Sequence, residues 1–304
     1  MRISTNTIYQ SGITQITSLQ ADQVKLQQQI STGKRITTPA DDPVASAQAL
    51  QLSYAQGINA KFADTRKTAQ LKLNTVESNL TSVTNLLVAA QSTLVGAGNG
   101  SYSNQERAFT ASDLQNSLDQ LMGLANTKDA SGNYLYAGFK TTTQPFTATA
   151  TGATYAGDSN QQLLQTDAQR QMAVNVTGDQ VFQAGGNDVF AALNSVVTLL
   201  NTPITNAASQ AAFSAGLATA ISTLQGSVDN VLNVRASIGS KLNELDTSDK
   251  SGSDRDLQYT KALSGLQDLD YASALSDFSK NQTIMDAAQK SFVTTTSLSL
   301  FKFM

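Results

Sequence analysis

Apolar residues recur at alternating steps of four and three along two long stretches of the chain. The first stretch follows Ala69, Leu73, Val76, Leu80, Val83, Leu87, Ala90 and Leu94. The second follows Leu217, Ile221, Leu224, Val228, Val231, Arg235, Ile238, Leu242 and Leu245, and a shorter series of Leu114, Leu118, Leu121 and Ala125 lies between them. This spacing places apolar side chains along one side of a helix, so it predicts long helices packed side by side.

Both ends of the chain carry the same kind of apolar stripe. Near the beginning it consists of Ile16, Leu19, Leu26 and Ile30, and near the end of Phe278, Met285 and Phe292 with Leu275 beside them. A single helix cannot bury such a stripe without a partner. We therefore expect the two end segments to pack on each other as an antiparallel pair, which would bring the termini together.

A different pattern occupies the middle of the chain, from Ser131 to about Gln183. Short β-prone runs alternate there with turn signals, which are Gly132–Asn133, Gly157–Asp158 and Gly178–Asp179. The runs are Tyr134–Tyr136, Phe146–Thr149, Gln162–Leu164 and Met172–Val176. This pattern predicts a small β-rich insertion between two helical halves.

Polar and glycine-rich segments predict where the long helices begin and end. In Thr37–Pro43 an aspartate can cap a new helix while Pro43 takes its first position. The paired aspartates could also bind a cation, but capping needs no ion and is commoner, so we predict no metal there. Gly96–Gly100 predicts the end of a long helix, and Asp246–Gly252 predicts the matching break in the C-terminal half.

These elements together predict a mainly α fold with a small β-rich insertion. Its centre is a long antiparallel coiled-coil helical bundle formed by the N- and C-terminal segments. We predict three domains, which are a terminal coiled-coil (axial) domain of residues 1–42 and 265–304, a helical-bundle domain of residues 43–130 and 184–264, and a β-rich insertion domain of residues 131–183.

The composition narrows the chemistry that this chain of 304 residues can perform. It contains no histidine and no cysteine, so the commonest acid–base group, thiol nucleophiles, thiolate ligands and disulfides are all absent. A net charge of −3 without a basic stripe argues against a nucleic-acid partner. No apolar run is long enough to span a membrane. We therefore predict no catalytic residue, cofactor, metal site, membrane or nucleic-acid partner.

Segments in both halves of the chain resemble the flagellin superfamily. Gln29–Ile36 followed by Asp41–Pro43 is similar to the superfamily's N-terminal signature of a small-residue turn, a basic pair and two aspartates. Arg235–Asn243 resembles its Arg-Ala-x-x-Gly-x-x-x-Asn helix, and Leu269–Asp277 resembles its Asp-(Phe/Tyr)-Ala segment. The resemblance covers both terminal regions in the same order, which makes it more specific than any single segment. It implies a flagellin-like fold and a structural, non-catalytic role.

Other segments resemble one group within the superfamily, the hook-associated protein 3 family, which joins the hook to the filament. They are Met1–Thr5, Tyr134–Phe139 with Pro145–Phe146, Val174–Phe182 and the aromatic tail Leu298–Met304. Met1–Gln10 lack the regions of a cleavable signal peptide. The resemblance implies uncleaved export through the flagellar type III apparatus with a chaperone on the C-terminal segment. It also implies an extracellular location in the flagellum and contact with the first hook-associated protein, with flagellin and with other copies of the chain.

The stripes at the two ends are the predicted assembly interface. A helix pair would still leave apolar positions uncovered, among them Ile13, Val24, Ile284 and Leu298, and exposed apolar area is costly in water. Only 14% of the residues are charged, so copies of the chain repel one another weakly. The predicted interface residues are Ile13, Ile16, Leu19, Leu26, Ile30, Leu275, Phe278, Met285, Phe292, Leu298, Leu300 and Phe301.

Other functions remain open from the sequence. Filament flagellin is the first alternative, and a type III needle-tip protein would share the helices but not the flagellin-like ends. Ser31–Lys34, Ser131–Asn133 and Lys250–Gly252 also spell the short motifs of a penicillin-recognising serine acyl-transferase. That enzyme needs its last motif on a strand, whereas Lys250 falls in a polar segment between predicted helices. We therefore rank the enzyme as a distant alternative.

Overall fold

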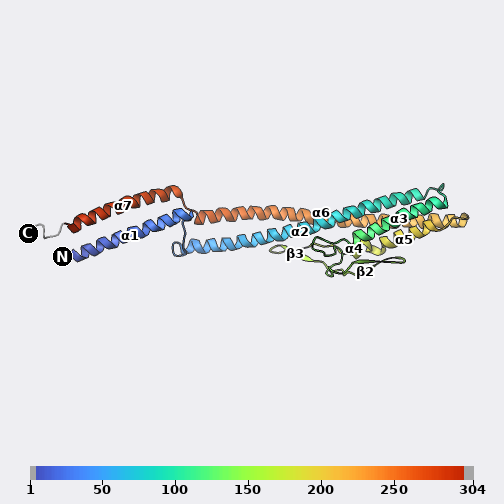
Figure 1. The fold of residues 1–304 in the computed structure, drawn as a ribbon, viewed down its shortest axis with the longest axis horizontal. Coiled ribbons are helices and arrows are strands. Elements are labelled where there is room, and N and C mark those ends of the chain that lie inside the picture. The colour runs from blue at the N-terminus through green and yellow to red at the C-terminus, as the bar shows by residue number, and fades with distance from the viewer. Residues whose placement is uncertain (1–4, 298–304) are drawn as a thin grey trace, which may run out of the picture. The chain divides into compact units, whose positions relative to one another are not determined.

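The computed structural model describes residues 5–297 and is mainly helical, with a small β region, as the sequence predicts (Figure 1). The helices are α1 (Thr5–Thr32), α2 (Pro43–Ala97), α3 (Asn104–Ala125), α4 (Gly178–Phe182), α5 (Val189–Asn201), α6 (Ala207–Gln267) and α7 (Tyr271–Ser297), with a short 3₁₀ turn at Ala184–Gly186. The strands are β1 (Phe146–Thr149), β2 (Gly152–Tyr155), β3 (Leu163–Asp167) and β4 (Arg170–Ala173).

Contacts within the chain define two compact units. Unit 1 contains residues 1–59 and 253–304, and unit 2 contains residues 60–252. The helices α2 and α6 each contribute to both units. The division into three domains with boundaries near residues 42, 131, 184 and 265 stays a prediction.

The long helices bury the apolar positions that the heptad spacing marks. Every position from Ala69 to Leu94 in the first series is buried on α2, and so is every position of the shorter series on α3. On α6 the positions are buried, except for half-buried Ile221, Arg235 and Leu242. The predicted helices and their packed sides are therefore confirmed. The periodicity is sufficient here because a side chain at each heptad step returns to the same side of the helix.

Among the described residues, α2 alone is long and apolar enough to cross a membrane by length and composition. Core helices of water-soluble proteins pass the same test, which makes it weak evidence for a span. The apolar residues Leu73, Leu80 and Leu87 of this helix are fully buried in the core of unit 2. Packing within the chain buries 39% of the apolar window of this helix.

Side-chain caps begin α2, where the sequence predicts a helix start, and α3, whose start was not predicted. The Asp42 carboxylate accepts a hydrogen bond from the Ala45 backbone N–H at 3.0 Å, and Pro43 is the first residue of α2. Ser103 and Glu106 form a reciprocal capping box at the start of α3. The helix α2 ends at Ala97, inside the predicted glycine-rich region.

The predicted break at Asp246–Gly252 is wrong, because α6 continues through it as a single helix. The segment contains no proline, and its polar residues cost little in a helix that tertiary contacts support. Asp249 forms an ion pair with Arg66 of α2 at 3.1 Å, and Gly252 is buried. Packing against α2 therefore outweighs the low helix propensity of this stretch.

Polar side chains join α2 to α6 in unit 2 and fix their antiparallel register. Arg235 lies at an otherwise apolar heptad position, half-buried, and donates to the Glu77 carboxylate at 2.9 Å. Gln70 donates to Asp246 at 3.0 Å further along the pair. The Arg235 charge is thus satisfied by a carboxylate of the same chain. A shift of one helix along the other would separate these partners and leave polar groups unpaired.

Two β-hairpins make up the small β region. Strand β1 pairs with β2 and β3 pairs with β4, both antiparallel, in two separate sheets. Three of the predicted β runs overlap these strands, but Tyr134–Tyr136 forms only an isolated bridge, from Tyr134 to Lys128. The Tyr136 hydroxyl instead donates to the Asn79 side chain of α2 at 2.6 Å. That segment is therefore fixed by a buried side chain and not by strand pairing.

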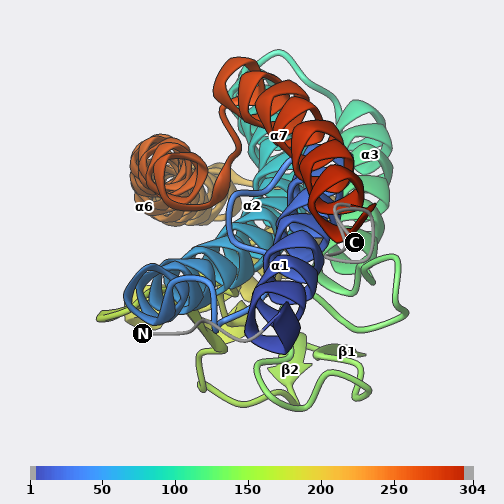
Figure 2. The same ribbon diagram turned by 90° about the vertical axis from the view of Figure 1, so that its left-hand side faces the viewer.

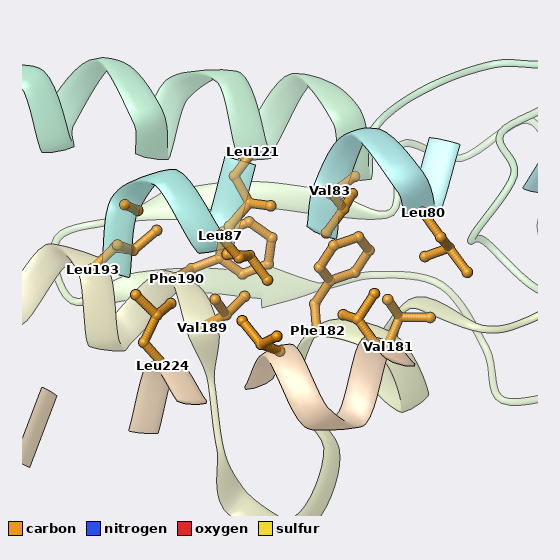
Figure 3. Packing of buried hydrophobic residues seen from close by; sticks show 14 of the residues in the cluster. Leu80, Val83, Leu87, Leu121, Val181, Phe182, Val189, Phe190, Leu193 and Leu224 are labelled. Atoms are coloured by element: carbon orange, nitrogen blue, oxygen red, sulfur yellow. The ribbon is translucent and has the colours of Figure 1, made fainter. Parts of the chain in front are cut away.

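Aromatic rings join the β region to the helices, and Figure 3 shows two of these rings, Phe182 and Phe190, close to Val83 and Leu87. Phe146 of β1 lies 5.4 Å from Phe182 and 5.0 Å from Phe190 between ring centroids, and all three rings are buried. They pack with Val83 and Leu87 in the continuous core of unit 2. An isolated two-stranded hairpin is only marginally stable in water. The hairpins are stable here because their apolar residues enter a core that the helices provide.

Two arginines attach the β3–β4 hairpin to the long helices. The Arg66 side chain, only 1% exposed, donates to the Asp249 carboxylate and, at 3.2 Å, to the backbone carbonyl of Thr166 in β3. Arg170 of β4 makes two hydrogen bonds to Glu244, at 2.6 and 2.8 Å, on the surface. One attachment is therefore buried and the other is exposed to solvent.

Replacing Arg66 with methionine should destabilise unit 2 more than the same replacement of Arg170. Arg66→Met leaves the buried Thr166 carbonyl without its donor, which should cost about 1–3 kcal/mol. Arg170→Met removes only a solvent-exposed ion pair, worth less than about 1 kcal/mol. Urea unfolding of both variants measures the difference. Equal losses would show that burial of the Arg66 attachment contributes nothing.

Candidate assembly interface

The two terminal helices pack on each other along their length. Figures 1 and 2 show α1 and α7 side by side, with the start of α1 and the end of α7 at the same end of the pair. Tyr9 near the start of α1 lies 5.2 Å from Phe292 near the end of α7, between ring centroids. Gly33, just after α1, lies against Tyr271 at the start of α7. The predicted antiparallel pairing of the two ends is therefore confirmed.

The residues predicted for the assembly interface fall into three groups. The first group is half-buried between α1 and α7, and its members are Ile16, Leu19, Leu26, Ile30, Phe278, Met285 and Phe292. The second group, Ile13 and Leu275, is exposed. Leu298, Leu300 and Phe301 lie outside the described residues. The contact of these side chains with other copies of the chain stays a prediction.

The helix pair leaves a substantial apolar surface open to solvent. Val24 is 64% exposed on α1, and Ile284 is 41% exposed on α7, as the stripe pattern predicts. Leu275 and Val293 add further exposed apolar side chains on α7. Apolar side chains left exposed in this way are candidates for protein–protein contact. The α1–α7 contact therefore buries only part of the apolar surface of the two helices.

The turn that follows α1 and the turn that precedes α7 are hydrogen-bonded to each other. The Arg35 backbone N–H donates to the Gln267 carbonyl at 2.7 Å, and the Leu269 N–H donates to the Gly33 carbonyl at 3.0 Å. We call these two turns, residues 33–42 and 267–271, the joint. Gly33 has a φ of +69°, and a Cβ there would lie 2.8 Å from the Tyr271 hydroxyl oxygen. Any larger residue at Gly33 would therefore strain the joint.

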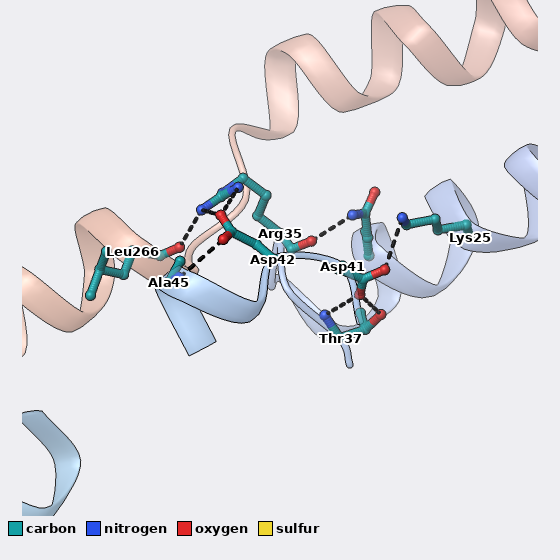
Figure 4. Close-up of polar contacts among 8 residues, drawn as sticks. Lys25, Arg35, Thr37, Asp41, Asp42, Ala45 and Leu266 are labelled. Atoms are coloured by element: carbon teal, nitrogen blue, oxygen red, sulfur yellow. Dashed lines mark hydrogen bonds and ion pairs between the residues drawn. The ribbon is translucent and has the colours of Figure 1, made fainter. Parts of the chain in front are cut away.

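Arginine and aspartate side chains complete the joint (Figure 4). The Arg35 guanidinium lies 3.4 Å from Asp42 and donates to the Leu266 carbonyl at 2.9 Å. A single side chain thus contacts the N-cap of α2 and the last turn of α6. The Gln29 side-chain amide donates to the Arg35 carbonyl at 2.6 Å and ties α1 to the same turn. The basic pair and the two aspartates of the sequence signature are therefore joint residues.

Asp41 organises the loop between α1 and α2. Its carboxylate receives an ion pair from Lys25 at 2.8 Å and hydrogen bonds from the backbone N–H groups of Thr37 and Thr38, at 3.1 and 2.9 Å. These donors, Lys25 above all, hold the pKa of Asp41 well below its ordinary value. The pKa of Asp42 is also lowered, chiefly because its carboxylate caps the Ala45 N–H.

Acid should weaken the joint, and Asp41→Asn should remove part of that pH dependence. Because the folded chain lowers the Asp41 pKa, the stabilisation is complete above the unfolded value of about 3.9 and is lost as pH falls through the folded value. The free energy of unfolding, measured by urea titration across this range, should therefore fall at low pH in the parent and fall less in Asp41→Asn. Asp277→Asn, on the exposed surface of α7, should keep the parent slope. Parallel curves for all three chains would contradict this role of Asp41.

The arrangement offers no support for acyl-transfer chemistry. Lys250 of the third penicillin-type motif lies exposed on α6, and not on a strand. Ser31 belongs to unit 1, whereas Ser131 and Lys250 belong to unit 2. Within residues 5–297 no group of three or more acidic, histidine or cysteine side chains has a geometry that could hold a metal ion.

Comparison with known proteins shows which protein family this chain resembles. Residues 3–141 match the model of the bacterial flagellin N-terminal helical region. Over 316 aligned residues the chain is 39% identical to flagellar hook-associated protein 3 of Escherichia coli (strain K12), with 99% of each chain covered. The chain belongs to the flagellar hook-associated protein 3 family. The Salmonella typhimurium (strain LT2) hook-associated protein 3 has the same identity and coverage, whereas Bacillus subtilis (strain 168) flagellin is 25% identical over 95% of this chain and 94% of its own.

Solved structures of hook-associated proteins share the fold. The flagellar junction protein FlgL from Legionella pneumophila superposes with a TM-score of 0.65 at 20% identity, covering 73% of this chain and 100% of its own. FlgL from Xanthomonas campestris superposes with a TM-score of 0.64 at 16% identity, covering 70% and 99%. At these identities the similarity establishes the fold alone. The mainly α, flagellin-like architecture expected from the sequence is thereby confirmed.

The structure adds residues that the sequence reasoning did not assign to the site. Arg35, Asp41 and Asp42 were recognised only as parts of a signature and a helix cap, yet they hold the joint together. Leu50 and Tyr54 of α2, both exposed in unit 1, lie outside the predicted interface. Their spacing of four residues is a signal in the sequence, but the stripe near the beginning of the chain is stronger because it is richer in large aliphatic residues.

Proposed function

We propose that this chain is a structural subunit of the bacterial flagellum that forms the junction between the hook and the filament. The observation that carries the proposal is the 39% identity to hook-associated protein 3 along the full length of both chains. Flagellin is a more distant relative at 25% identity. A solved protein of the same fold is described as the flagellar junction protein. The open apolar sides of α1 and α7 support a function in which contact between subunits is the activity.

Assembly follows from the physical chemistry of these surfaces. Apolar side chains left exposed by the helix pair, such as Ile13 and Val24, gain roughly 25 cal/mol for each Å² that another subunit covers. A subunit that offers different surfaces above and below forms head-to-tail contacts, which continue as rings or helical stacks. The proposed partners are copies of the chain, the first hook-associated protein on the hook side and flagellin on the filament side.

We also propose that the chain has no catalytic activity and reaches this position by export. The described surface supports assembly through apolar packing, and the family resemblance implies a structural role. Export through the flagellar type III apparatus, without cleavage and with a chaperone on the C-terminal segment, is the route that the family resemblance implies. Such a route leads to an extracellular position in the flagellum.

Immunogold labelling of intact flagella tests the proposal directly. An epitope tag inserted in the exposed turn at residues 150–151, between β1 and β2, avoids both terminal helices. Gold particles should gather at the base of the filament, where hook and filament meet. Deletion of the gene should leave flagellin unpolymerised in the medium and remove the label. Gold distributed along the filament would instead show that the chain is the filament flagellin.

A further inference from the structure

The first turns of α2 carry a second apolar stripe on the side that faces solvent. The stripe follows Pro43, Ala47, Leu50, Tyr54 and Gly57, with the same alternating steps of four and three as the buried series. All of these residues are exposed, Leu50 by 73% and Tyr54 by 72%. We call this set the outer stripe of α2. Its spacing is the one at which a helix packs against another helix.

The opposite side of the same segment already has a partner within the chain. Ala45, Ala49 and Asn59 are buried there, and Gln56 donates to Asp256 of α6 at 3.0 Å. The outer stripe is therefore additional to the helix pairing that holds unit 1 together. A helix with two heptad stripes on opposite sides can take part in two helix–helix contacts. Only the inner contact is made by the described residues of this chain.

The outer stripe is free of charge. No acidic or basic residue occurs between Asp42 and Lys61, so five turns of α2 expose only apolar, small and uncharged polar side chains. A partner with charges at the contact would have to bury them without counter-ions, which is costly. The electrostatics therefore favour a partner helix whose contacting side is also uncharged.

One helix of unit 1 has such a side. On α1, the exposed positions Ile13, Thr17, Gln20, Val24, Gln27 and Ser31 follow the same steps of four and three and include no charge. Exposed apolar positions on α6 and α7 have charged neighbours on the same side of their helix. Leu257 of α6 lies three residues after Asp254 and four before Lys261, and the line from Leu275 to Val293 on α7 includes Asp286.

A groove beside the outer stripe has room for side chains of a partner. It has a volume of about 340 Å³ and is lined by Ile36, Pro39, Ser46, Ala49, Leu50 and Ser53, among others.

We propose that the outer stripe of α2 binds the outer side of α1 of a second copy of this chain. This contact joins two different surfaces, so it repeats from one copy to the next around the junction without pairing off into closed dimers. The inference rests on the proposed function, since both copies must be in the same assembly. It adds to that function a defined surface on α2 and a defined partner helix.

Photo-crosslinking in intact flagella tests this contact. Tyr54→p-benzoylphenylalanine keeps an aromatic ring on the outer stripe, and Gln48→p-benzoylphenylalanine places the same probe on the same helix, exposed but outside the stripe. After irradiation, the Tyr54 probe should give a band at twice the mass of the chain, and its crosslinked peptide should map to α1 near Val24. The Gln48 probe should give much less of this product.

Several outcomes would overturn the contact. They are a Tyr54 product that contains flagellin or another hook protein, a dimer that maps outside α1, equal yields from both probes, and no product. Immunogold label at the filament base in the same sample keeps the proposed function intact in each of these cases. Label elsewhere would instead refute the proposed function itself.

Charge insertion gives an independent measurement that does not depend on a probe. Leu50→Lys should lower the amount of chain in purified flagella at least roughly tenfold, since a charge must then be buried at the contact. Gln48→Lys adds the same charge outside the stripe and should be incorporated normally. Both residues are exposed, so both purified variants should keep the unfolding midpoint of the parent. Equal incorporation of the two variants would overturn the proposal.

Discussion

Replacing Phe292 with aspartate is expected to exclude the chain from the flagellum and to release flagellin into the medium. Phe292 packs against Tyr9, and a Cβ added at Gly12 would lie 2.5 Å from its ring. A carboxylate at this position would lose its hydration against apolar neighbours, and the ring's own burial, worth about 1–2 kcal/mol, would be lost as well.

We expect Phe292→Asp to reduce assembly more than it reduces the stability of a single copy. In the proposed junction every subunit uses the same pair of terminal helices, so each subunit in the assembly would carry the penalty. A cost of about 1.4 kcal/mol at one contact already lowers binding tenfold. Quantitative immunoblots of purified flagella and of the culture medium measure incorporation and released flagellin. We expect almost no variant chain in the flagella and most flagellin in the medium.

Gln289→Asp is the matched control for this experiment. It introduces the same carboxylate one turn earlier on α7, at an exposed polar position. It should be incorporated like the parent chain. If Phe292→Asp and Gln289→Asp assemble equally well, the α1–α7 pair is not needed at the junction. The packing of the terminal helices would then be a property of the free chain only.

Local periodicity was sufficient to predict the helical part of this fold. The heptad positions from Leu73 to Leu94 predicted both the existence of α2 and the side on which it is buried. The capping role of an aspartate before Pro43 was also readable, because a cap involves residues only three positions apart. Where the interacting residues are close in sequence, the local pattern is enough to predict the structure.

Contacts between distant residues could not be predicted in the same way. Arg35 donates to the Leu266 carbonyl across 231 positions of the sequence, and no local signal marks that partner. The supposed break at Asp246–Gly252 failed for the same reason, because its helix depends on packing against α2. The strand predicted at Tyr134–Tyr136 failed because the buried Tyr136 bonds to Asn79, which is 57 positions away.

The outer stripe of α2 is present in the sequence, but it is hard to recognise because most of its residues are small or weakly hydrophobic. Three of its five members are Pro43, Ala47 and Gly57, which contribute little to a hydrophobic pattern. Small residues let a partner helix approach closely, so they are informative at a contact and almost silent in a periodicity analysis. The structure reveals the stripe, because it shows that no other part of the described chain buries the side chains of Leu50 and Tyr54.

Replacing Phe190 with alanine is expected to destabilise unit 2 by about 3–5 kcal/mol. Phe190 is completely buried on α5, and its ring lies 5.0 Å from Phe146 and 5.6 Å from Phe182 between centroids. The loss combines the transfer of the ring to water, the cavity that remains, and the contacts with two neighbouring rings. Because these rings connect β1, α4 and α5, the cavity would open where the β region meets the helices.

Urea unfolding followed by circular dichroism measures this loss. With a slope of about 1–3 kcal/mol per molar urea, the midpoint should fall by at least roughly 1 M. Phe109→Ala deletes the same ring from α3 at a position that is 64% exposed, and it should change the free energy of unfolding by less than about 0.5 kcal/mol. If the two variants unfold at the same urea concentration, the aromatic cluster is not what attaches the β region. The hairpins would then depend on Arg66 and Arg170, whose methionine variants measure that contribution separately.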